Sequence, residues 1–350
     1  MLSGRVGIER FDPAGDAASR RALYDIYAEG APIDDPVAPV MSFGVFGGWL
    51  VHGWTAEPRE TWLVSEGASA VGGYVLGLPD RENQDHGSLE ILVAPARRRG
   101  GLGTVLLRHA AERARVRRRS VLTADTKDGS PGEAFARWTG ASPGLAEIRR
   151  IQELGTLAPG QLASLRATAE AAAAGYSLLS WEGPSPAEYL DQLAALNEAM
   201  ADAPRGPGEE AQSWDAERIR GADRRVAAQG LRYYSVAVRN DVSGPLAGLT
   251  QLGVDPAQPE WGQQELTAVA RPHRGHRLGL LLKTAMLELL ARREPQLKWI
   301  LTGNAQTNRH MIAINEALGY RVLDQWTEGW RLPVERALTL RPAQRAGRQS

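Results

Sequence analysis

The chain contains two turns of one kind, each placed between an apolar extended run and an amphipathic helix. The first occupies residues 94–104 and the second residues 270–279, and their central arginines, Arg98 and Arg274, lie 176 residues apart. A strand that ends in such a turn directs backbone N–H groups and the positive end of the following helix at one point. The sequence therefore predicts that each turn holds an anion such as a pyrophosphate.

The composition predicts two globular domains without a strong overall charge. A chain of 350 residues with 43% hydrophobic content is long enough for two hydrophobic cores. The 41 basic side chains balance the 41 acidic ones, so no global field draws the protein to nucleic acid or to an anionic membrane. Any anion site must therefore be local, and nucleic-acid or membrane partners are not expected.

Residue types that are missing or scattered exclude several kinds of chemistry. The sequence has no cysteine, which excludes disulfides, thiolate nucleophiles and cysteine-ligated zinc. Its six histidines show no i,i+4 pair and no carboxylate at ligand spacing, so we expect no metal site. The start of the chain shows no signal-peptide core, and no apolar run reaches the length of a bilayer span. We therefore expect a cytoplasmic protein.

The order of predicted elements repeats along the chain, which indicates one domain doubled. Predicted strands fall at residues 5–11, 61–66, 70–79, 86–95, 120–125, 177–181, 233–238, 246–254, 263–269 and 299–302. Predicted helices fall at residues 20–29, 102–114, 133–139, 159–175, 186–200, 216–228, 278–292 and 308–318. Between the first helix and the second strand, the glycine-rich aromatic segment 36–54 is interpreted as a lid or as packing against the neighbouring domain.

These patterns predict the domain boundaries. We expect an N-terminal domain over residues 1–155, a helical linker over 156–176, a C-terminal domain over 177–340 and a flexible tail over 341–350. The linker is rich in alanine and leucine and ends at a glycine, as is typical of a helix with a glycine C-cap.

The first turn resembles the signature of the GCN5-related N-acetyltransferase (GNAT) superfamily, Arg/Gln-x-x-Gly-x-Gly/Ala after a Val-x-Pro strand. Val93, Pro95, Arg98, Gly101 and Gly103 match that signature position by position. The strand before the turn, the glycines within it and the helix after it agree with one another.

The second turn is similar to the same signature. Its matching residues are Val269, Arg274, Gly275, Leu278 and Gly279, and Arg277 stands where the middle glycine is usual. Residues 302–308 and 315–320 resemble the closing strand, the asparagine-initiated helix and the Gly-Tyr exit of the superfamily.

The resemblance covers nearly the whole chain and implies an α/β (α+β) fold of two GNAT-like domains, each with a mixed, mostly antiparallel sheet flanked by helices. The layout is similar to that of the tandem acetyltransferases typified by mycothiol synthase. A composition rich in arginine, alanine and glycine suits a bacterium of high GC content.

The resemblance also implies acetyl-CoA, or another acyl-CoA, as co-substrate. Its pyrophosphate is expected on the turn, beside the charges of Arg97, Arg98 and Arg99, and its pantetheine arm between two splayed strands. The glycines let the backbone approach the phosphates, whereas the alternative is a tight connection with a solvated basic face. The expected cofactor-binding residues are Val93, Arg98, Arg99, Gly100, Gly101, Leu102, Gly103, Thr104, Val269, Arg274, Gly275, His276, Arg277, Leu278, Gly279, Asn304 and Asn308.

Candidate catalytic residues follow from the same resemblance. The family often places a general base on the strand before the turn, where Glu90 and Glu265 stand. A glutamate at the edge of such a strand is more often a surface or ion-paired residue, so Glu90 and Glu265 are candidates only. The usual tyrosine general acid is replaced by Ala136 in the first half and Asn315 in the second. Asn315 is therefore a candidate for orienting a water or the substrate.

Other interpretations of this step remain open. Tyr320 or His310 is an alternative acid, and a thiolate is also able to leave without help because the pKa of a thiol is near 8.5. Asn308 is a candidate for binding the pantetheine arm, although an ordinary helix N-cap explains it equally.

The predicted function is acyl transfer from acyl-CoA to an amine of a small molecule, by direct attack in a ternary complex. The donor is expected at the N-terminal turn most securely, and the acceptor chemistry in the C-terminal half. Two alternatives remain: an acyltransferase whose donor is a carrier protein or an aminoacyl-tRNA, and a non-catalytic CoA-binding sensor. The sequence does not specify the acceptor or the oligomeric state.

Overall fold

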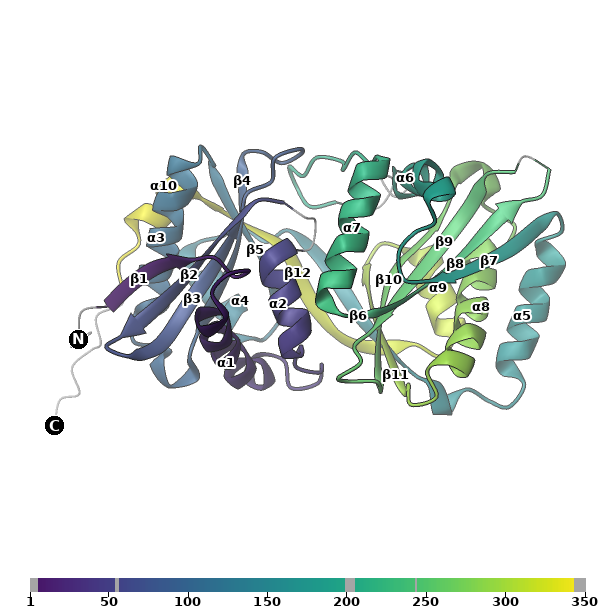
Figure 1. Cartoon of the computed structure of the whole chain (residues 1–350), viewed down its shortest axis with the longest axis horizontal. Coiled ribbons are helices and arrows are strands. Elements are labelled where there is room, and N and C mark those ends of the chain that lie inside the picture. Colours follow the sequence, from purple (N-terminus) through teal and green to yellow (C-terminus); the bar gives the residue numbers. More distant parts are fainter. Residues whose placement is uncertain (1–5, 54–56, 199–204, 243, 343–350) are drawn as a thin grey trace. The chain divides into compact units, whose positions relative to one another are not determined.

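A computed structural model describes residues 6–53, 57–198, 205–242 and 244–342, and Figure 1 labels its elements. The chain forms two compact units. Within the described residues, the N-terminal unit consists of the chain up to residue 145, residues 206–210 and the chain from residue 326 onward. The C-terminal unit consists of residues 146–205 and 211–325.

The N-terminal unit is built on a sheet whose strands follow the order β1-β2-β3-β4-β5-β12. The pair β4–β5 is parallel, and β1–β2, β2–β3, β3–β4 and β5–β12 are antiparallel. Its strands are β1 (Val6–Phe11), β2 (Arg59–Glu66), β3 (Ser69–Gly77), β4 (His86–Val93), β5 (Val121–Lys127) and the second part of β12 (Arg321–Pro333).

Helices cover both faces of this sheet because β3 is apolar on both sides and must be buried twice. One core joins the sheet to α3 (Leu102–Val116) and α10 (Val334–Thr339), and the other joins it to α1 (Ala17–Asp34) and α2 (Phe43–His52). The short helix α4 (Pro131–Thr139) follows β5 and is capped by Ser130, whose Oγ accepts a hydrogen bond from the Glu133 N–H.

The C-terminal unit repeats this architecture, with the strand order β6-β11-β10-β9-β8-β7. The pair β10–β11 is parallel, and β6–β11, β9–β10, β8–β9 and β7–β8 are antiparallel. Its strands are β6 (Leu145–Glu153), β7 (Tyr176–Glu182), β8 (Arg232–Asn240), β9 (Leu246–Val254), β10 (Trp261–Val269) and β11 (Trp299–Ala305).

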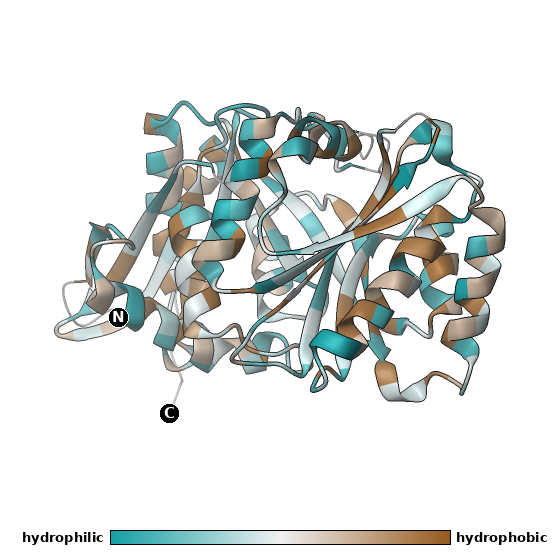
Figure 2. Ribbon diagram, turned by 45° about the vertical axis from the view of Figure 1, so that its right-hand side comes forward, coloured by the Kyte–Doolittle hydropathy of each residue, from teal (hydrophilic) through white to brown (hydrophobic). Residues whose placement is uncertain are grey.

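Two cores again lie on opposite faces of the sheet. One contains α8 (Leu278–Arg293) with α5 (Gln161–Ala172) and α9 (Arg309–Ala317), and the other contains α6 (Leu190–Glu198) with α7 (Ala216–Gln229). The helices in Figure 2 carry both brown hydrophobic and teal hydrophilic residues, as amphipathic helices do. No helix in the described part of the chain is long and apolar enough to cross a bilayer.

In each unit the two parallel strands pair over a short stretch and then separate. The β4–β5 ladder joins residues 86–88 to residues 121–123, and the β10–β11 ladder joins residues 261–263 to residues 299–301. Each of β4 and β10 then continues alone on that side to its turn. This is the splayed arrangement that the resemblance implied, and the mixed, mostly antiparallel sheets in two GNAT-like domains are confirmed.

The chain crosses between the units in a way that the sequence pattern did not show. The expected domains assigned residues 145–155 to the first half and residues 326–340 to the second. In the structure β6 pairs with β11 of the C-terminal unit, whereas residues 326–333 of β12 pair with β5 of the N-terminal unit. The last strand of each half therefore belongs to the unit built mainly from the other half.

Candidate active site

The two turns have the same backbone conformation at equivalent positions. In the first, Arg99 and Gly101 have φ values of 62° and 90°, and in the second, Gly275 and Arg277 have φ values of 91° and 53°. Left-handed residues at these two positions reverse the chain between a short 3₁₀ segment and the long helix. The order of arginine and glycine at these two positions is reversed between the turns, whereas the backbone conformation is the same.

The signature arginine of each turn ties the turn back to the strand before it. Arg98 Nε donates to the Val93 carbonyl oxygen at 3.1 Å, and Arg274 Nε donates to the Val269 carbonyl oxygen at 3.2 Å. The role of this position is thus to hold the turn against its strand.

The positive charge of the first turn is largely neutralised. Arg98 forms a bidentate ion pair with Asp34, with N–O distances of 2.7 and 2.8 Å, and Arg97 is paired with Glu66. Arg99 is exposed. The expectation that all three arginines supply charge to phosphates therefore needs correction for Arg97 and Arg98, whose guanidinium groups already bind carboxylates.

The two turns also differ in what covers them. A Cβ placed on Gly101 would lie 2.9 Å from Pro342 Cβ, so the chain beyond α10 packs against the first turn. A Cβ placed on Gly275 would meet no atom within 4 Å, and Arg274, His276 and Arg277 are exposed. The second turn therefore offers the more open surface.

Several of the expected donor-binding positions have buried side chains. Leu102, Thr104 and Leu278 are at most 4% exposed. A Cβ on Gly103 would contact the Phe135 ring, and one on Gly279 would lie 3.0 Å from Ile314 Cδ1. At these positions only the backbone remains to contribute to an anion site. Neither α3 nor α8 receives a side-chain cap at its N-terminus from the described residues.

Glu90, the candidate base of the first half, lies on β4 beyond the point where β4 and β5 separate. Its side chain is exposed, but the protein atoms around it raise the pKa of its carboxyl to about 7, and the negative charge of Asp125 contributes. Burial also raises the pKa of Asp125, and the charge of Glu209 adds to this shift. Glu90 thus stands among acidic groups.

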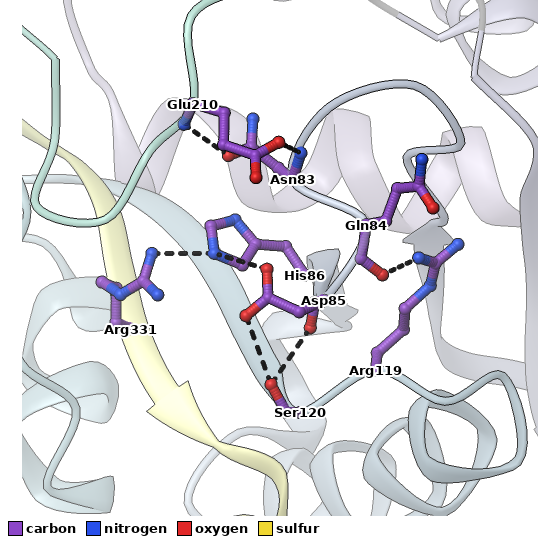
Figure 3. A network of polar contacts seen from close by, with 8 residues as sticks. All are labelled: Asn83, Gln84, Asp85, His86, Arg119, Ser120, Glu210 and Arg331. Carbon is purple, nitrogen blue, oxygen red and sulfur yellow. Dashed lines mark hydrogen bonds and ion pairs between the residues drawn. The ribbon is translucent and has the colours of Figure 1, made fainter.

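The segment 206–210, which contains Glu209, is fixed to the N-terminal unit by a reciprocal pair of hydrogen bonds (Figure 3). The Asn83 N–H donates to Glu210 Oε2, and the Glu210 N–H donates to Asn83 Oδ1, both at 2.8 Å. Nearby, Arg331 of β12 donates to His86 Nε2 at 2.9 Å. Burial lowers the pKa of His86, and the charge of Arg331 contributes to that shift.

Glu265, the candidate base of the second half, lies at a β-bulge. The β9–β10 register shifts between Gln264 and Thr267, so that Glu265 and Leu266 together stand opposite Gln251. The side chain of Glu265 keeps an exposed surface, yet the surrounding protein raises the pKa of its carboxyl, and the positive charge of Arg225 partly offsets this.

Glu265 lines a pocket of about 280 Å³ in the C-terminal unit. The pocket lies among α6, α7 and strands β8, β9 and β10. Its lining includes Asp223 and Arg225 of α7, Tyr233 of β8, and Trp214. These four residues were not predictable from the sequence, because none belongs to a motif and only their convergence in space distinguishes them.

Asn315, the third catalytic candidate, belongs to a buried polar chain. Its Oδ1 accepts a hydrogen bond from Lys283 Nζ at 2.5 Å, and its Nδ2 donates to Asn304 Oδ1 at 2.7 Å. Asn308 caps α9 by accepting from the Met311 N–H at 3.3 Å. In the structure both Asn304 and Asn308 therefore make contacts within the protein.

Tyr320 and His310, the alternative acids, are placed differently. Tyr320 is buried, and burial raises the pKa of its phenol, whereas His310 is exposed on the first turn of α9. Among the residues with described positions, no group of three or more histidine, aspartate or glutamate side chains is arranged to hold a metal ion.

Comparisons with known proteins agree with this geometry. Residues 20–136 match the profile of the Acetyltransferase (GNAT) family. Over 94% of its length the chain is similar to 99% of a solved tandem GNAT protein from the clavulanic acid biosynthesis pathway, with 29% identity and a TM-score of 0.80. Among curated proteins, none matches the sequence significantly.

A second solved structure shows the same fold at lower identity. It is a GCN5-related N-acetyltransferase from Sphaerobacter thermophilus, with 17% identity and a TM-score of 0.63, in which 95% of this chain aligns with 97% of that one. The repeated turns, the splayed strands, the family match over residues 20–136 and the likeness to the solved tandem GNAT protein lead to one conclusion: the chain is an N-acetyltransferase built of two GNAT-like domains.

Proposed function

We propose that the protein transfers an acyl group from acyl-CoA to the amine of a small molecule, and that the C-terminal unit carries the reaction. One observation supports this proposal above the others. Beyond Gln263, where its ladder with β11 ends, β10 runs from the pocket carboxylate Glu265 to the open turn at residues 270–278. One strand thus links a pocket, the proposed acceptor site, to an exposed turn, the proposed pyrophosphate site.

The residues around β10 suit the parts of the donor. The exposed turn and the uncapped start of α8 offer backbone N–H groups to the pyrophosphate. The free side of β10 suits an extended pantetheine arm that pairs as an added strand. The space beside Gly275, where a Cβ would meet no atom within 4 Å, fits a close approach of the phosphates.

In the proposed reaction the amine nitrogen attacks the thioester carbonyl carbon. The C–N bond forms, the C–S bond breaks, and the CoA thiolate leaves. Glu265 accepts a proton from the amine, directly or through one water. The raised pKa of Glu265 makes it a stronger base than an ordinary glutamate.

Calorimetry with acetyl-CoA tests the location of the donor. Gly100 and His276 occupy equivalent, exposed positions of the two turns, so Gly100→Glu and His276→Glu form a matched pair. We expect His276→Glu to weaken binding at least tenfold and Gly100→Glu to change it less than twofold. The opposite pattern would move the donor to the N-terminal unit, and no binding by the unaltered chain would refute the proposal.

A further inference from the structure

The pocket beside Glu265 has a charge pattern that restricts the acceptor. Its lining contains two carboxylates, Asp223 and Glu265, and both act on the pKa of the Tyr233 phenol. Burial raises the pKa of Tyr233, and the charges of Glu265 and Asp223 raise it further, whereas Arg225 lowers it. Asp223, Arg225 and Glu265 all line the pocket, and they sum to a single negative charge when all are ionised.

Asp223 is held in a fixed orientation. The Ser185 N–H donates to Asp223 Oδ2 at 3.0 Å and the Ser185 hydroxyl donates to Asp223 Oδ1 at 3.2 Å. Ser185 itself lines the pocket. Because a carboxylate oxygen is able to accept more than one hydrogen bond, both oxygens keep capacity for a further donor. An ammonium group, which has three donors and no acceptor, matches that capacity.

The rest of the pocket wall has an apolar part and a polar part. The apolar part is formed by Leu193, Trp214, Ile219, Ala222, Val226, Leu249 and Leu266. The polar part is formed by the amides of Asn197 and Gln251, which already donate to the Leu193 carbonyl oxygen and the Ser235 hydroxyl. A volume of about 280 Å³ is at the lower end of small-molecule pockets. A ligand that fills it is able to place a hydrophobic body of metabolite size against the apolar part.

We propose that Asp223 selects the acceptor, and that the acceptor is a small hydrophobic primary amine without a carboxylate. This inference rests on the proposed function, because it takes the pocket as the acceptor site. The ammonium binds between Asp223 and Glu265, and the apolar body lies against Trp214 and the leucines. A carboxylate on the ligand is disfavoured because Asp223 and Glu265 both line the pocket, and the Arg225 guanidinium, the one cationic group among the lining residues, already donates to Gln229 Oε1 at 3.4 Å.

Calorimetry on the full chain at pH 7 without CoA tests the selection, with three probes of similar shape. They are 2-phenylethylamine, its uncharged counterpart 2-phenylethanol, and phenylalanine, which adds a carboxylate. We expect 2-phenylethylamine to bind at least tenfold more tightly than either of the others. Equal binding of 2-phenylethanol, tighter binding of phenylalanine, or no binding of the amine would overturn the inference.

Variants separate the effect of the Asp223 charge from the effect of the Ser185 hydrogen bond that orients it. Asp223→Asn is expected to weaken the binding of 2-phenylethylamine at least tenfold. Ser185→Ala, which keeps the negative charge of Asp223, is expected to weaken this binding less. Asp191→Asn removes an exposed carboxylate from α6 and serves as the matched control, with a change below twofold. Thermal unfolding of each variant confirms that it is folded. An equal loss in Asp223→Asn and Asp191→Asn contradicts a selective role for Asp223.

A turnover assay keeps the two proposals distinguishable. Release of CoA thiol from acetyl-CoA is measured with 2-phenylethylamine and with a panel of other amines. Binding of the amine without thiol release from any amine supports the selection by Asp223 and refutes acyl transfer. Thiol release with other amines, when 2-phenylethylamine does not bind, refutes the selection and supports acyl transfer.

Discussion

Lys283 donates a hydrogen bond from its ammonium to Asn315 Oδ1 at 2.5 Å, and both side chains are almost completely buried. The Lys283 nitrogen also lies 4.6 Å from the centre of the Tyr320 ring. Asn315 in turn donates to Asn304. This chain ties α8, α9 and the end of β11 together, at the helix position where the related enzymes usually carry a tyrosine.

The buried lysine predicts an unusual dependence of stability on pH. Burial lowers the pKa of Lys283 to about 7, from an ordinary value of 10.5. Between these values the unfolded chain binds a proton that the folded chain has released, so stability rises with pH. The expected slope is at most about 1.4 kcal/mol per pH unit. The measurement is urea unfolding of the unaltered chain and Lys283→Met at pH 7, 8.5 and 10.

As the pH rises through this window, the free energy of unfolding of the unaltered chain is expected to increase relative to that of Lys283→Met, because the variant lacks the titrating group. Lys298→Met is the control, since the side chain of Lys298 is 58% exposed. Parallel curves for the unaltered chain and Lys283→Met would show that Lys283 titrates normally.

Arg277, the arginine with left-handed backbone conformation in the second turn, is expected to lower the free energy of unfolding and to strengthen the binding of acetyl-CoA. Arg277 has a φ of 53°, where glycine is favoured over other residues by about 1 kcal/mol. Arg277→Gly should raise the free energy of unfolding by about 0.5–1 kcal/mol. The variant should also bind acetyl-CoA three- to tenfold more weakly, with a smaller salt dependence, because a positive charge is lost.

Arg118→Gly is the matched control for this prediction. Arg118 is also exposed, has a φ of 59° and belongs to the N-terminal unit, whereas the second turn belongs to the C-terminal unit. It should gain similar stability and leave the affinity for acetyl-CoA unchanged. Tighter binding of acetyl-CoA by Arg277→Gly would mean that the arginine obstructs the phosphates.

The contact between Pro342 and Gly101 predicts that the first turn becomes accessible when the end of the chain is removed. A chain that ends at Leu340 keeps the buried leucine of the N-terminal core and loses Pro342. Calorimetry should then show a second, weaker acetyl-CoA site, because Arg97 and Arg98 remain paired with carboxylates. Adding Gly100→Glu should abolish that site. An unchanged stoichiometry in the shortened chain contradicts the prediction.

Much of the fold was predictable because most elements carry a local signal. The strands before the turns and the helices after them follow from apolar periodicity. Strands β6 and β12 were missed, since each contains charged residues whose neutralising partners are distant. Arg149 of β6, for example, is ion-paired with Asp324 of β12. Such pairing is a property of the folded sheet, and local pattern does not reveal it.

Helix α2 was also missed. Its two adjacent glycines and nearly continuous apolar residues were interpreted as a lid or as packing, and residue 54 of that segment lies outside the described part of the chain. In the structure Phe46, Trp49 and Leu50 are buried against α1 in the N-terminal unit. A helix buried on most sides lacks the amphipathic period by which helices are recognised.

The site was predictable only along the sequence motifs. The turns and the two glutamates were identified, because a short motif fixes them. Two contacts alter what the first turn is able to bind: Asp34 neutralises Arg98, and Pro342 packs against Gly101. Both partners come from elements far away in the sequence. Asp223 was also not predictable, since a single aspartate on the polar side of a predicted helix is usually a solvated charge.

Comparing the two glutamates separates the roles of the two units. Glu265→Gln should lower kcat/KM about 10²- to 10⁴-fold, because an amide accepts no proton from the amine. Glu90→Gln should retain most of the activity if the C-terminal unit carries the reaction. Steady-state kinetics with acetyl-CoA and one amine measure both variants. A loss confined to Glu90→Gln would assign catalysis to the N-terminal unit.

The pH profile adds an independent check on Glu265. A base must be deprotonated to act, and the pKa of Glu265 is raised by its surroundings. The value of kcat/KM should therefore fall on the acid side as Glu265 becomes protonated, at a pH above that of an ordinary glutamate. Glu265→Gln should lose this acid limb and keep any limb that reflects the acceptor amine. An acid limb that persists unchanged in Glu265→Gln would assign the titration to another group.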